Sequence, residues 1–358
     1  MATKKIPKLK QEDYKTSYFE FWPAWLFYLP MKLYAVYLAI RFRSLTVPTI
    51  SNPSFDAGGF AGESKAQILD LVPPSAQKWF ARHKAFSTPI STQNALQFIK
   101  EHQFNYPFVM KPDIGCRGYG VQIAHSDQDV ENYIRDYPTG ETIVIQDLYD
   151  YPYEAGVFYI RHPDEEKGHI FSLTLKYLPH VTGDGTSTLQ ELIEANPRSN
   201  ALKHKYFPRH KDYLDMVLPK GEQFRIAFAG SHTWGTIFKD GNHLITDAMT
   251  DKFDEISKFV PEFYFGRYDV RFNTLSDLET GENMKIIEIN GATSEATHIW
   301  DSNTSLFSAY KTLMIQYHHM FEIGYKNKKR GKVPVPLKEV LARIKKGDAL
   351  INNYPVTH

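Results

Sequence analysis

Residues 106–124 read YPFVMKPDIGCRGYGVQIA, a short apolar stretch followed by a glycine-rich loop and a second β-rich stretch. Gly115, Gly118 and Gly120 can adopt backbone conformations closed to other residues, and they let backbone N–H groups approach a phosphate. The spacing is G-x-x-G-x-G, and strand-like residues follow the loop where a Walker or Rossmann loop requires a helix. We therefore interpret the segment as a glycine flap between antiparallel strands, with Lys111 as a point charge for phosphate. The alternative is a glycine hairpin beside a surface lysine.

A second β-rich stretch, much nearer the C-terminal end, carries charges where a core strand would be apolar. It reads GRYDVR at residues 266–271. Side chains alternate between the two faces of a strand, so Arg267, Asp269 and Arg271 are expected on one face. That face is expected to border water or a ligand.

A third stretch, KIIEIN at residues 285–290, combines an apolar and a polar face. Glu288 and Asn290 are expected on one face, and Ile287 and Ile289 are expected to point the other way. The two isoleucines imply that one face of this strand is buried, so the opposite face can be exposed to water.

Thr280-Gly281-Glu282 lies between these two stretches, and we interpret it as a hairpin turn. Pairing of the strands would bring Asp269, Glu288 and Asn290 together as oxygen ligands. Hard oxygen ligands suit magnesium, which binds a few carboxylates together with phosphate oxygens. The alternative is a solvated hairpin with scattered surface charge.

The composition is that of an ordinary globular protein. The chain has 358 residues, of which 42% are hydrophobic and 23% charged, and this length suffices for two or three domains. The formal net charge is +1, so no bulk attraction to nucleic acid is expected. The single cysteine, Cys116, excludes an internal disulfide and fits a reducing compartment, so we expect a cytoplasmic protein.

An unusually aromatic segment lies near the N-terminus. Residues 21–40 read FWPAWLFYLPMKLYAVYLAI, with one charge at Lys32, and are about as long as the ~20 residues that a membrane span needs. Pro23 and Pro30 interrupt the stretch as a single helix. We expect helices packed onto the protein body. Two alternatives stay open: a membrane span, and a peripheral membrane contact through residues 14–50, with Trp22, Trp25 and Tyr28 at the interface.

The region from 85 to 325 mixes strand and helix patterns, which predicts an α/β (α+β) fold rather than an all-β sandwich. Strands are predicted at 108–110, 121–124, 142–146, 156–160, 170–177, 224–229 and 285–290. Helices are predicted from Lys65, after Ser91, and at 188–195, 304–321 and 337–344. In the loop GGFAGESK before the first of these helices, Lys65 is a further candidate for substrate or phosphate binding.

In this order along the chain, the glycine segment and the acidic stretches resemble the ATP-grasp superfamily, which includes D-alanine–D-alanine ligase and cyanophycin synthetase. The resemblance spans residues 85–325 and implies an ATP-grasp fold, in which two α+β subdomains clasp ATP. It divides the chain into an aromatic-rich helical region (1–84), a flap subdomain (85–147), a metal and acceptor subdomain (148–325) and a basic tail with a short helix (326–358). The N-terminal region departs from the family because it is short and aromatic where D-alanine–D-alanine ligases have an α/β substrate domain.

The resemblance also assigns nucleotide-binding residues. Lys111 and the flap glycines Gly115, Gly118 and Gly120 match the phosphate-binding strand and loop, and Lys176 matches a second phosphate lysine. The stretch IVIQDLYDYPYEAGVF at 143–158 resembles the hinge between the subdomains. It implies adenine contacts from Gln146, Asp147 and Leu148, and a ribose contact from Glu154.

By the same resemblance, Asp269, Glu288 and Asn290 are magnesium ligands, with manganese as the alternative ion. Arg267 matches the arginine that stabilises negative charge in the reaction. Three residues are substrate candidates: Arg225, Ser294 and His298. A surface ion pair would also explain Arg225, and a structural role would also explain His298.

The activity implied is an ATP- and Mg²⁺-dependent ligase that joins a small carboxylate and an amine, or a related nucleophile, through an acyl phosphate. The alternatives are an ATP-grasp kinase and a non-catalytic ATP-binding module peripheral to the membrane.

Overall fold

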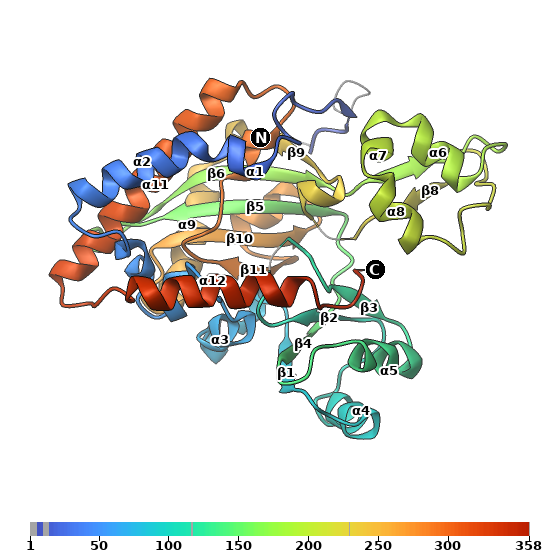
Figure 1. Cartoon of the computed structure of the whole chain (residues 1–358), viewed down its shortest axis with the longest axis horizontal. Helices are drawn as coiled ribbons and strands as arrows, with labels where there is room; N and C mark the ends of the chain where they lie inside the picture. Colours follow the sequence, from blue (N-terminus) through green and yellow to red (C-terminus); the bar gives the residue numbers. More distant parts are fainter. Residues whose placement is uncertain (1–5, 10–13, 116, 229, 358) are drawn as a thin grey trace.

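The computed structural model describes residues 6–9, 14–115, 117–228 and 230–357, and Cys116 lies outside them. Within these described ranges the strands form three antiparallel sheets, with strand orders β1-β4-β2-β3, β11-β10-β5-β6-β9 and β7-β8. The first two sheets face each other across the middle of the molecule, and the small third sheet lies in a lobe at one end (Figure 1). The predicted class, mixed α and β, is confirmed.

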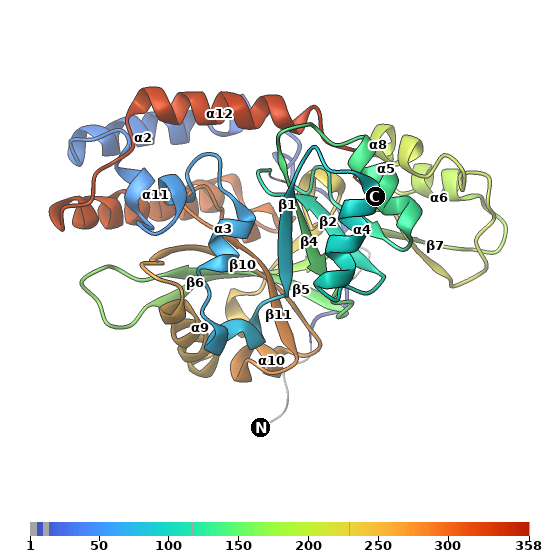
Figure 2. The same ribbon diagram turned by 90° about the horizontal axis from the view of Figure 1, so that it is seen from below.

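The four-stranded sheet belongs to the flap region. Its strands are β1 (His83–Ser87), β4 (Thr142–Asp147), β2 (Phe108–Pro112) and β3 (Gln122–Ala124). Helices α4 (Thr92–Glu101) and α5 (Asp127–Arg135) lie on one side of the sheet (Figure 2). Each starts at a serine whose hydroxyl accepts a backbone N–H, Ser91 and Ser126 respectively. Their apolar faces bury Ile99, Val130 and Tyr133 against the sheet.

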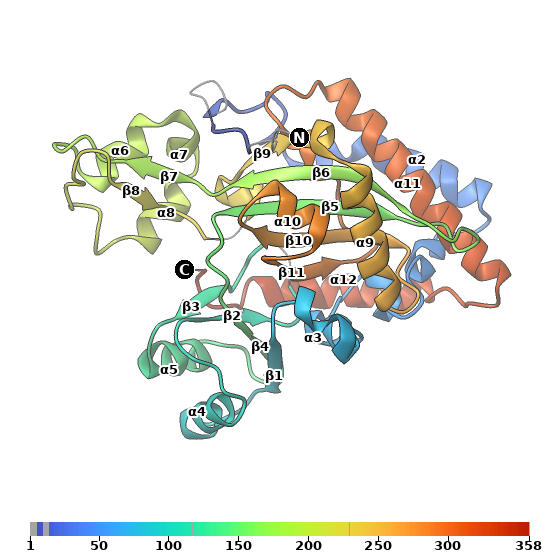
Figure 3. The same cartoon turned by 180° about the vertical axis from the view of Figure 1, so that it is seen from behind.

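The five-stranded sheet forms the centre of the larger part. Its strands are β11 (Met284–Asn290), β10 (Phe265–Phe272), β5 (Tyr153–Ile160), β6 (His169–Tyr177) and β9 (Ile237–Asp240). Helices α9 (Asp247–Phe259) and α10 (Leu275–Thr280) cover one face (Figure 3). Beneath them, alternate residues such as Val157, Tyr268 and Val270 form the largest core cluster.

The opposite face of this sheet is apolar over one half and charged over the other. Phe158, Ile160 and Phe265 pack on helices α2 (Leu29–Arg41) and α11 (Leu306–Lys329). Farther along the same strands, Lys176 and Asp269 take the place of apolar side chains on this face. The charged half of this face borders the four-stranded sheet.

A register shift in β11 corrects one expectation from the sequence. Glu288 lies opposite Asp269, and the next paired residue on β11 is Ile286, opposite Val270, so Ile287 is an extra residue. Ile286 and Ile289 are buried in the core under α9, whereas Ile287 lines the cleft with Glu288. The prediction that Ile287 shares the buried face with Ile289 is therefore wrong.

The link between β10 and β11 also differs from the expected hairpin turn. Residues Leu275–Thr280 form helix α10, which begins with a capping box between Thr274 and Asp277. Gly281 ends the helix in the left-handed conformation, at φ 75°. The glycine read as a turn residue is a helix C-cap.

One face of the N-terminal aromatic segment packs onto the body, as expected. Helix α1 (Ala24–Phe27) and helix α2 lie beside α11, and Phe19 and Phe27 are buried against Trp300. Among the described residues, no helix combines the length and apolar character needed to cross a membrane.

The lobe inserted between β6 and β9 holds the third sheet. Its elements are β7 (His180–Thr182), α6 (Leu189–Ala195), α7 (Pro197–Ala201), α8 (Lys203–Arg209), β8 (Gln223–Arg225) and the short helix η5 (His232–Trp234). The strand predicted at 224–229 ends at Arg225, so it is shorter than expected.

The remaining elements connect these parts. They are the 3-10 helices η2 (Val47–Ile50), η3 (Asp56–Gly59), η4 (Pro74–Trp79), η6 (Asn242–Leu244) and η7 (Thr297–Trp300), together with α3 (Lys65–Asp70) and α12 (Leu337–Ile351). After α12, the C-terminal residues reach the glycine loop between β2 and β3.

Candidate functional site

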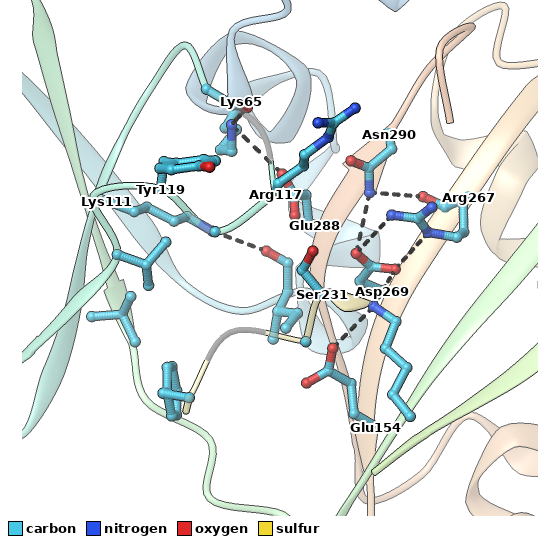
Figure 4. A pocket seen from close by; sticks show the side chains of 18 of the residues that line it. Lys65, Lys111, Arg117, Tyr119, Glu154, Ser231, Arg267, Asp269, Glu288 and Asn290 are labelled. Carbon is cyan, nitrogen blue, oxygen red and sulfur yellow. Dashed lines mark hydrogen bonds and ion pairs between the residues drawn. The ribbon is translucent and has the colours of Figure 1, made fainter. Parts of the chain in front are cut away.

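A cleft of about 420 Å³ lies between the four-stranded and five-stranded sheets, and charged side chains from both point into it (Figure 4). Strands β2 and β4 give one wall, and strands β5, β6, β10 and β11 give the other. The glycine loop between β2 and β3 borders the cleft. Residues far apart in the sequence, Lys111 on one wall and Asp269 and Glu288 on the other, therefore line a single cavity.

The wall of the four-stranded sheet presents Lys111. Its Nζ donates to Gln146 Oε1 at 2.9 Å and to the carbonyl of Ile287 at 3.2 Å. Lys111 and Gln146 share a face because Val109, two residues before the lysine, lies opposite Gln146. Burial lowers the pKa of Lys111 to about 8, and the nearby Glu288 offsets part of this effect. Both hydrogen-bond partners are neutral, so neither cancels the charge of the ammonium group.

The wall of the five-stranded sheet presents a network of ion pairs. Lys176 Nζ lies 3.0 Å from Glu154 Oε1 and 2.9 Å from Asp269 Oδ1. Arg267 Nε lies 2.8 Å from Asp269 Oδ1, and Arg271 Nη2 lies 2.9 Å from Glu154 Oε2. Burial alone would raise the pKa of Asp269, but Arg267 and Lys176 hold it well below its usual range. In this network three cations share two carboxylates, and Glu288 on β11 adds a third carboxylate to the same wall.

Glu288 and Asn290, at the end of β11, lie beside this network. Glu288 lies opposite Asp269 in the strand pairing, and its closest cation is Lys65, with Nζ 3.6 Å from Oε1. The amide nitrogen of Asn290 donates to Asp269 Oδ2 at 3.4 Å, which leaves its Oδ1 without a hydrogen bond among the described residues. The carboxylate of Glu288 and this amide oxygen can therefore accept a cation without losing a close partner.

The predicted hinge residues lie at the C-terminal end of β4 and directly after it. Gln146, Asp147 and Leu148 all line the cleft. Both oxygens of Asp147 are held by Arg82, at 2.8 and 2.9 Å. Arg82 therefore holds the carboxylate of Asp147 at the border of the cleft. Glu154 also lines it, although both of its oxygens are engaged by Lys176 and Arg271.

The glycine loop is held from two sides by contacts that the sequence did not indicate. Thr357 donates its hydroxyl to the carbonyl of Gly118 at 2.9 Å and accepts the N–H of Gly120 at 3.0 Å. Trp234, in the lobe, donates its indole N–H to the carbonyl of Arg117 at 2.8 Å. Gly115 and Gly118 line the cleft. Gly120 packs between Pro112 and Tyr354, and its N–H is used by Thr357.

The start of α3 and the loop before it place two charged residues, Lys65 and Glu63, at or beside the cleft. Lys65 lines the cleft and donates to the carbonyl of Gly115 at 2.7 Å, so it connects the flap to the side of the cleft that carries Glu288. Glu63 accepts the N–H of Gly291 at 3.1 Å, directly after Asn290. Burial raises the pKa of Glu63 to about 8, although Lys65 opposes the shift. The sequence made Lys65 a candidate, and it did not point to Glu63.

The end of the cleft beyond Arg267 is lined by residues from three distant segments. Tyr28 comes from the aromatic N-terminal segment, Arg117 from the flap and Glu295 from the loop after β11. Tyr28 donates to Glu295 at 2.7 Å, and Trp300 donates to the other oxygen at 2.6 Å. Burial nevertheless raises the pKa of Glu295. Strand periodicity gave no signal for these residues because none of them lies on a strand.

The three substrate candidates lie in different surroundings. Arg225 is half-exposed in the lobe, 3.9 Å from Asp150, and it is not among the residues that line the cleft. Ser294 lines the cleft, but its hydroxyl donates to the carbonyl of Gly291 at 2.6 Å. His298 is buried and bonded to Ser172 at 2.8 Å, and burial lowers its pKa. The structural alternatives for Arg225 and His298 fit this geometry, whereas Ser294 borders the cleft.

No protein-family model and no curated protein matches the sequence. Among solved structures, the chain is similar to VanG D-Ala:D-Ser ligase from Enterococcus faecalis, at 12% identity and a TM-score of 0.42, over 76% of this chain and 63% of that one. It is similar to the D-alanine–D-alanine ligase from Coxiella burnetii, at 8% identity and a TM-score of 0.41, over 77% and 64%. It is also similar to a bifunctional glutathione synthetase from Pasteurella multocida, at 15% identity and a TM-score of 0.36, over 70% and 36%. The chain thus spans less than two thirds of each of these proteins.

The chain's own geometry brings the sequence motifs together on two sheets. A four-stranded antiparallel sheet carries the strand lysine and the glycine flap, and a five-stranded one carries the Arg-Asp and Glu-Asn strands. The two sheets border one charged cleft, and they carry these motifs in the chain order on which the sequence resemblance rests.

Proposed function

We propose that this chain is an ATP- and Mg²⁺-dependent ligase that activates a carboxylate as an acyl phosphate and transfers the acyl group to an amine. One observation carries the proposal: Lys111 on one sheet and Asp269, Glu288 and Asn290 on the other line the same cleft. A triphosphate with its metal needs both kinds of group, cations for the phosphate oxygens and oxygen ligands for the metal.

The nucleotide would enter with its base at Gln146–Leu148 and its phosphates toward the flap. Lys111 would offer a buried ammonium group, and Lys176 a second one that is already oriented by Asp269 and Glu154. Gly115 and Gly118 border the same space and let the backbone approach the phosphates. Closure of the flap would exclude water, which would otherwise hydrolyse an acyl phosphate.

The oxygen donors fit a divalent cation. Glu288 has its closest ion-pair partner at 3.6 Å, and the Oδ1 atom of Asn290 has no hydrogen bond among the described residues. Asp269 is ion-paired to Arg267 and Lys176. Its carboxylate oxygens would therefore contact the metal while they keep these two partners. Mg²⁺, or Mn²⁺ in its place, would neutralise charge on the phosphates.

Arg267 is suited to stabilise negative charge at the reacting carbonyl. Its Nε is fixed by Asp269, and its Nη1 donates to the carbonyl of Glu295 at 3.0 Å, so the guanidinium group is held at the border between the metal strands and the far end of the cleft. In the proposed reaction the carboxylate oxygen attacks the γ-phosphorus and ADP leaves. The amine then attacks the acyl carbon, and phosphate leaves.

The proposal is tested by ADP release from the purified chain with Mg²⁺ and panels of amino acids and small carboxylic acids, with hydroxylamine present to trap acyl phosphates. A ligase releases ADP only with its carboxylate and yields a hydroxamate. A kinase would release ADP with a hydroxyl acceptor and yield no hydroxamate. A non-catalytic binding module would bind ATP and release no ADP with any acceptor, and either result would contradict the proposal.

A further inference from the structure

Helix α2 is apolar around most of its circumference, yet only one side of it is covered. Its inner side buries Met31 and Leu38. On its outer side Leu33 is 67% exposed and Ile40 is 74% exposed. The full exposed set on α1 and α2 is Trp25, Leu26, Leu29, Leu33, Val36, Tyr37 and Ile40. A helix that is apolar on all sides is normally buried, so we expect a partner to bind this outer face.

The exposed residues form one continuous stripe. Leu29, Leu33, Val36, Tyr37 and Ile40 follow the three- and four-residue spacing that places side chains on one face of a helix. The helix lies on the outside of α11, along the edge of the molecule (Figures 1 and 3). The stripe therefore faces away from the body of the protein.

The exposed charges of the segment that carries the stripe have a single sign. The exposed charged residues between positions 14 and 50 are Lys15, Lys32, Arg41 and Arg43. The only acidic residue in that span is Glu20, which is buried and paired with Arg198. An apolar stripe with basic residues and no exposed acid complements a surface that is apolar within and negatively charged at its edge.

We propose that the outer face of α1 and α2 binds the interface of an anionic lipid bilayer, with the helix lying in the plane of the membrane. Trp25 and Tyr37 are of the residue types that favour the headgroup level, and Lys32 can extend its ammonium group to lipid phosphates. Thirteen residues of helix extend about 20 Å, shorter than the ~30 Å hydrocarbon core, so α2 lies along the membrane and does not cross it. The buried inner side stays packed on α11, so binding needs no unfolding.

The test is flotation of the full chain with two kinds of vesicle, pure phosphatidylcholine and phosphatidylcholine mixed with phosphatidylserine. The wild type is expected to float with the anionic vesicles and more weakly with the neutral ones. Leu33→Asp with Ile40→Asp should reduce binding to both by about tenfold or more, because charges replace apolar side chains that would insert into the bilayer. Lys32→Gln with Arg41→Gln should reduce binding to the anionic vesicles and leave the neutral ones unchanged.

Tyr213→Asp is the matched control, because it places an acid on an exposed aromatic residue of the distant lobe. It should leave vesicle binding unchanged, and thermal melting should show that every variant is folded. Absence of wild-type binding to both vesicle types would overturn the proposal. A second result would also overturn it: the wild type binds no vesicles and is a dimer in light scattering, and Leu33→Asp with Ile40→Asp is a monomer. A second copy of the chain would then cover this face.

Discussion

The two walls of the cleft differ in how their charged side chains are paired. On the five-stranded sheet, Asp269 and Glu154 are joined to Lys176, Arg267 and Arg271 by ion pairs of 2.8 to 3.0 Å, so this wall is organised before any ligand arrives. On the four-stranded sheet, Lys111 has only neutral hydrogen-bond partners among the described residues. The glycine flap beside it is held by Trp234 and Thr357, which lie elsewhere in the chain.

This difference indicates a division of roles. A network of paired charges keeps its geometry and loses little entropy on binding, which is the preorganisation that transition-state stabilisation requires. A buried cation with neutral partners gains most when an anion arrives, because its desolvation is then compensated. We therefore expect changes in the five-stranded wall to lower turnover, and changes in the four-stranded wall to weaken nucleotide binding.

The largest effect is expected from removing charge on the five-stranded wall. Glu288→Gln and Asp269→Asn should each lower Mg²⁺-dependent ADP release by about 10³-fold, because a lost metal ligand is worth several kcal/mol. Asp269→Asn also leaves Arg267 and Lys176 without a shared partner. Glu282→Gln, on the exposed turn before β11, is the control and should be neutral. Full turnover of Glu288→Gln would rule out the metal assignment.

The next largest effect is expected from the loss of the Lys111 ammonium group on the wall of the four-stranded sheet. Lys111→Met keeps most of the side-chain volume and should weaken ATP binding by about 10²-fold, as measured by calorimetry, since a desolvated charge-assisted contact to phosphate is lost. Lys84→Met, an exposed lysine of the same sheet, should bind ATP as the wild type does. Equal affinities of the two variants would show that Lys111 does not contact the phosphates.

The depressed pKa of Lys111 predicts a pH dependence. With a pKa of about 8, the lysine is charged below this pH and loses its proton above it, so ATP affinity should be level below pH 8 and fall as the pH rises. Lys111→Arg stays charged throughout and should flatten the profile. Glu63→Gln is the companion variant, because burial raises the pKa of that carboxyl to about 8 as well. A wild-type profile with no fall above pH 8 would contradict the prediction.

The smallest effect is expected from the contacts that hold the flap. Thr357→Val removes the hydroxyl that joins Gly118 to Gly120, so hydrogen exchange of residues 115–121 should become faster and the KM for ATP should rise several-fold, in line with about 1 kcal/mol for a hydrogen bond. Val356→Ala, at an exposed neighbouring side chain, is the control. Unchanged exchange in Thr357→Val would mean that the tail does not restrain the flap.

The sequence predicted the fold class from its mixed strand and helix patterns, and strand alternation together with the family resemblance pointed to the main polar residues of the cleft. Asp269, Glu288 and Asn290 stand out because they lie on the polar face of strands whose other face is apolar. Ile287 was misplaced because a bulge shifts the register by one residue, and alternation cannot reveal a bulge. Helix α10 did have a signal, the capping-box residues Thr274 and Asp277, which the glycine after the helix obscured.

Residues placed by tertiary contacts could not be predicted in this way. Tyr28, Arg117 and Glu295 meet at one end of the cleft from three segments, none of them a strand. Thr357 reaches the flap from the last residues of the chain. Their positions depend on how α2, the lobe and the C-terminal tail pack on the sheets, and a local pattern carries no information about that packing.

The central claim is that both walls bind the same triphosphate, and a crystal structure with a non-hydrolysable ATP analogue and Mn²⁺ tests it most directly. The anomalous signal of manganese locates the ion independently of the nucleotide. We predict a manganese peak at Glu288 and Asn290, with the terminal phosphates between that ion and Lys111. A nucleotide bound outside the cleft, or a manganese peak away from β10 and β11, would contradict the claim.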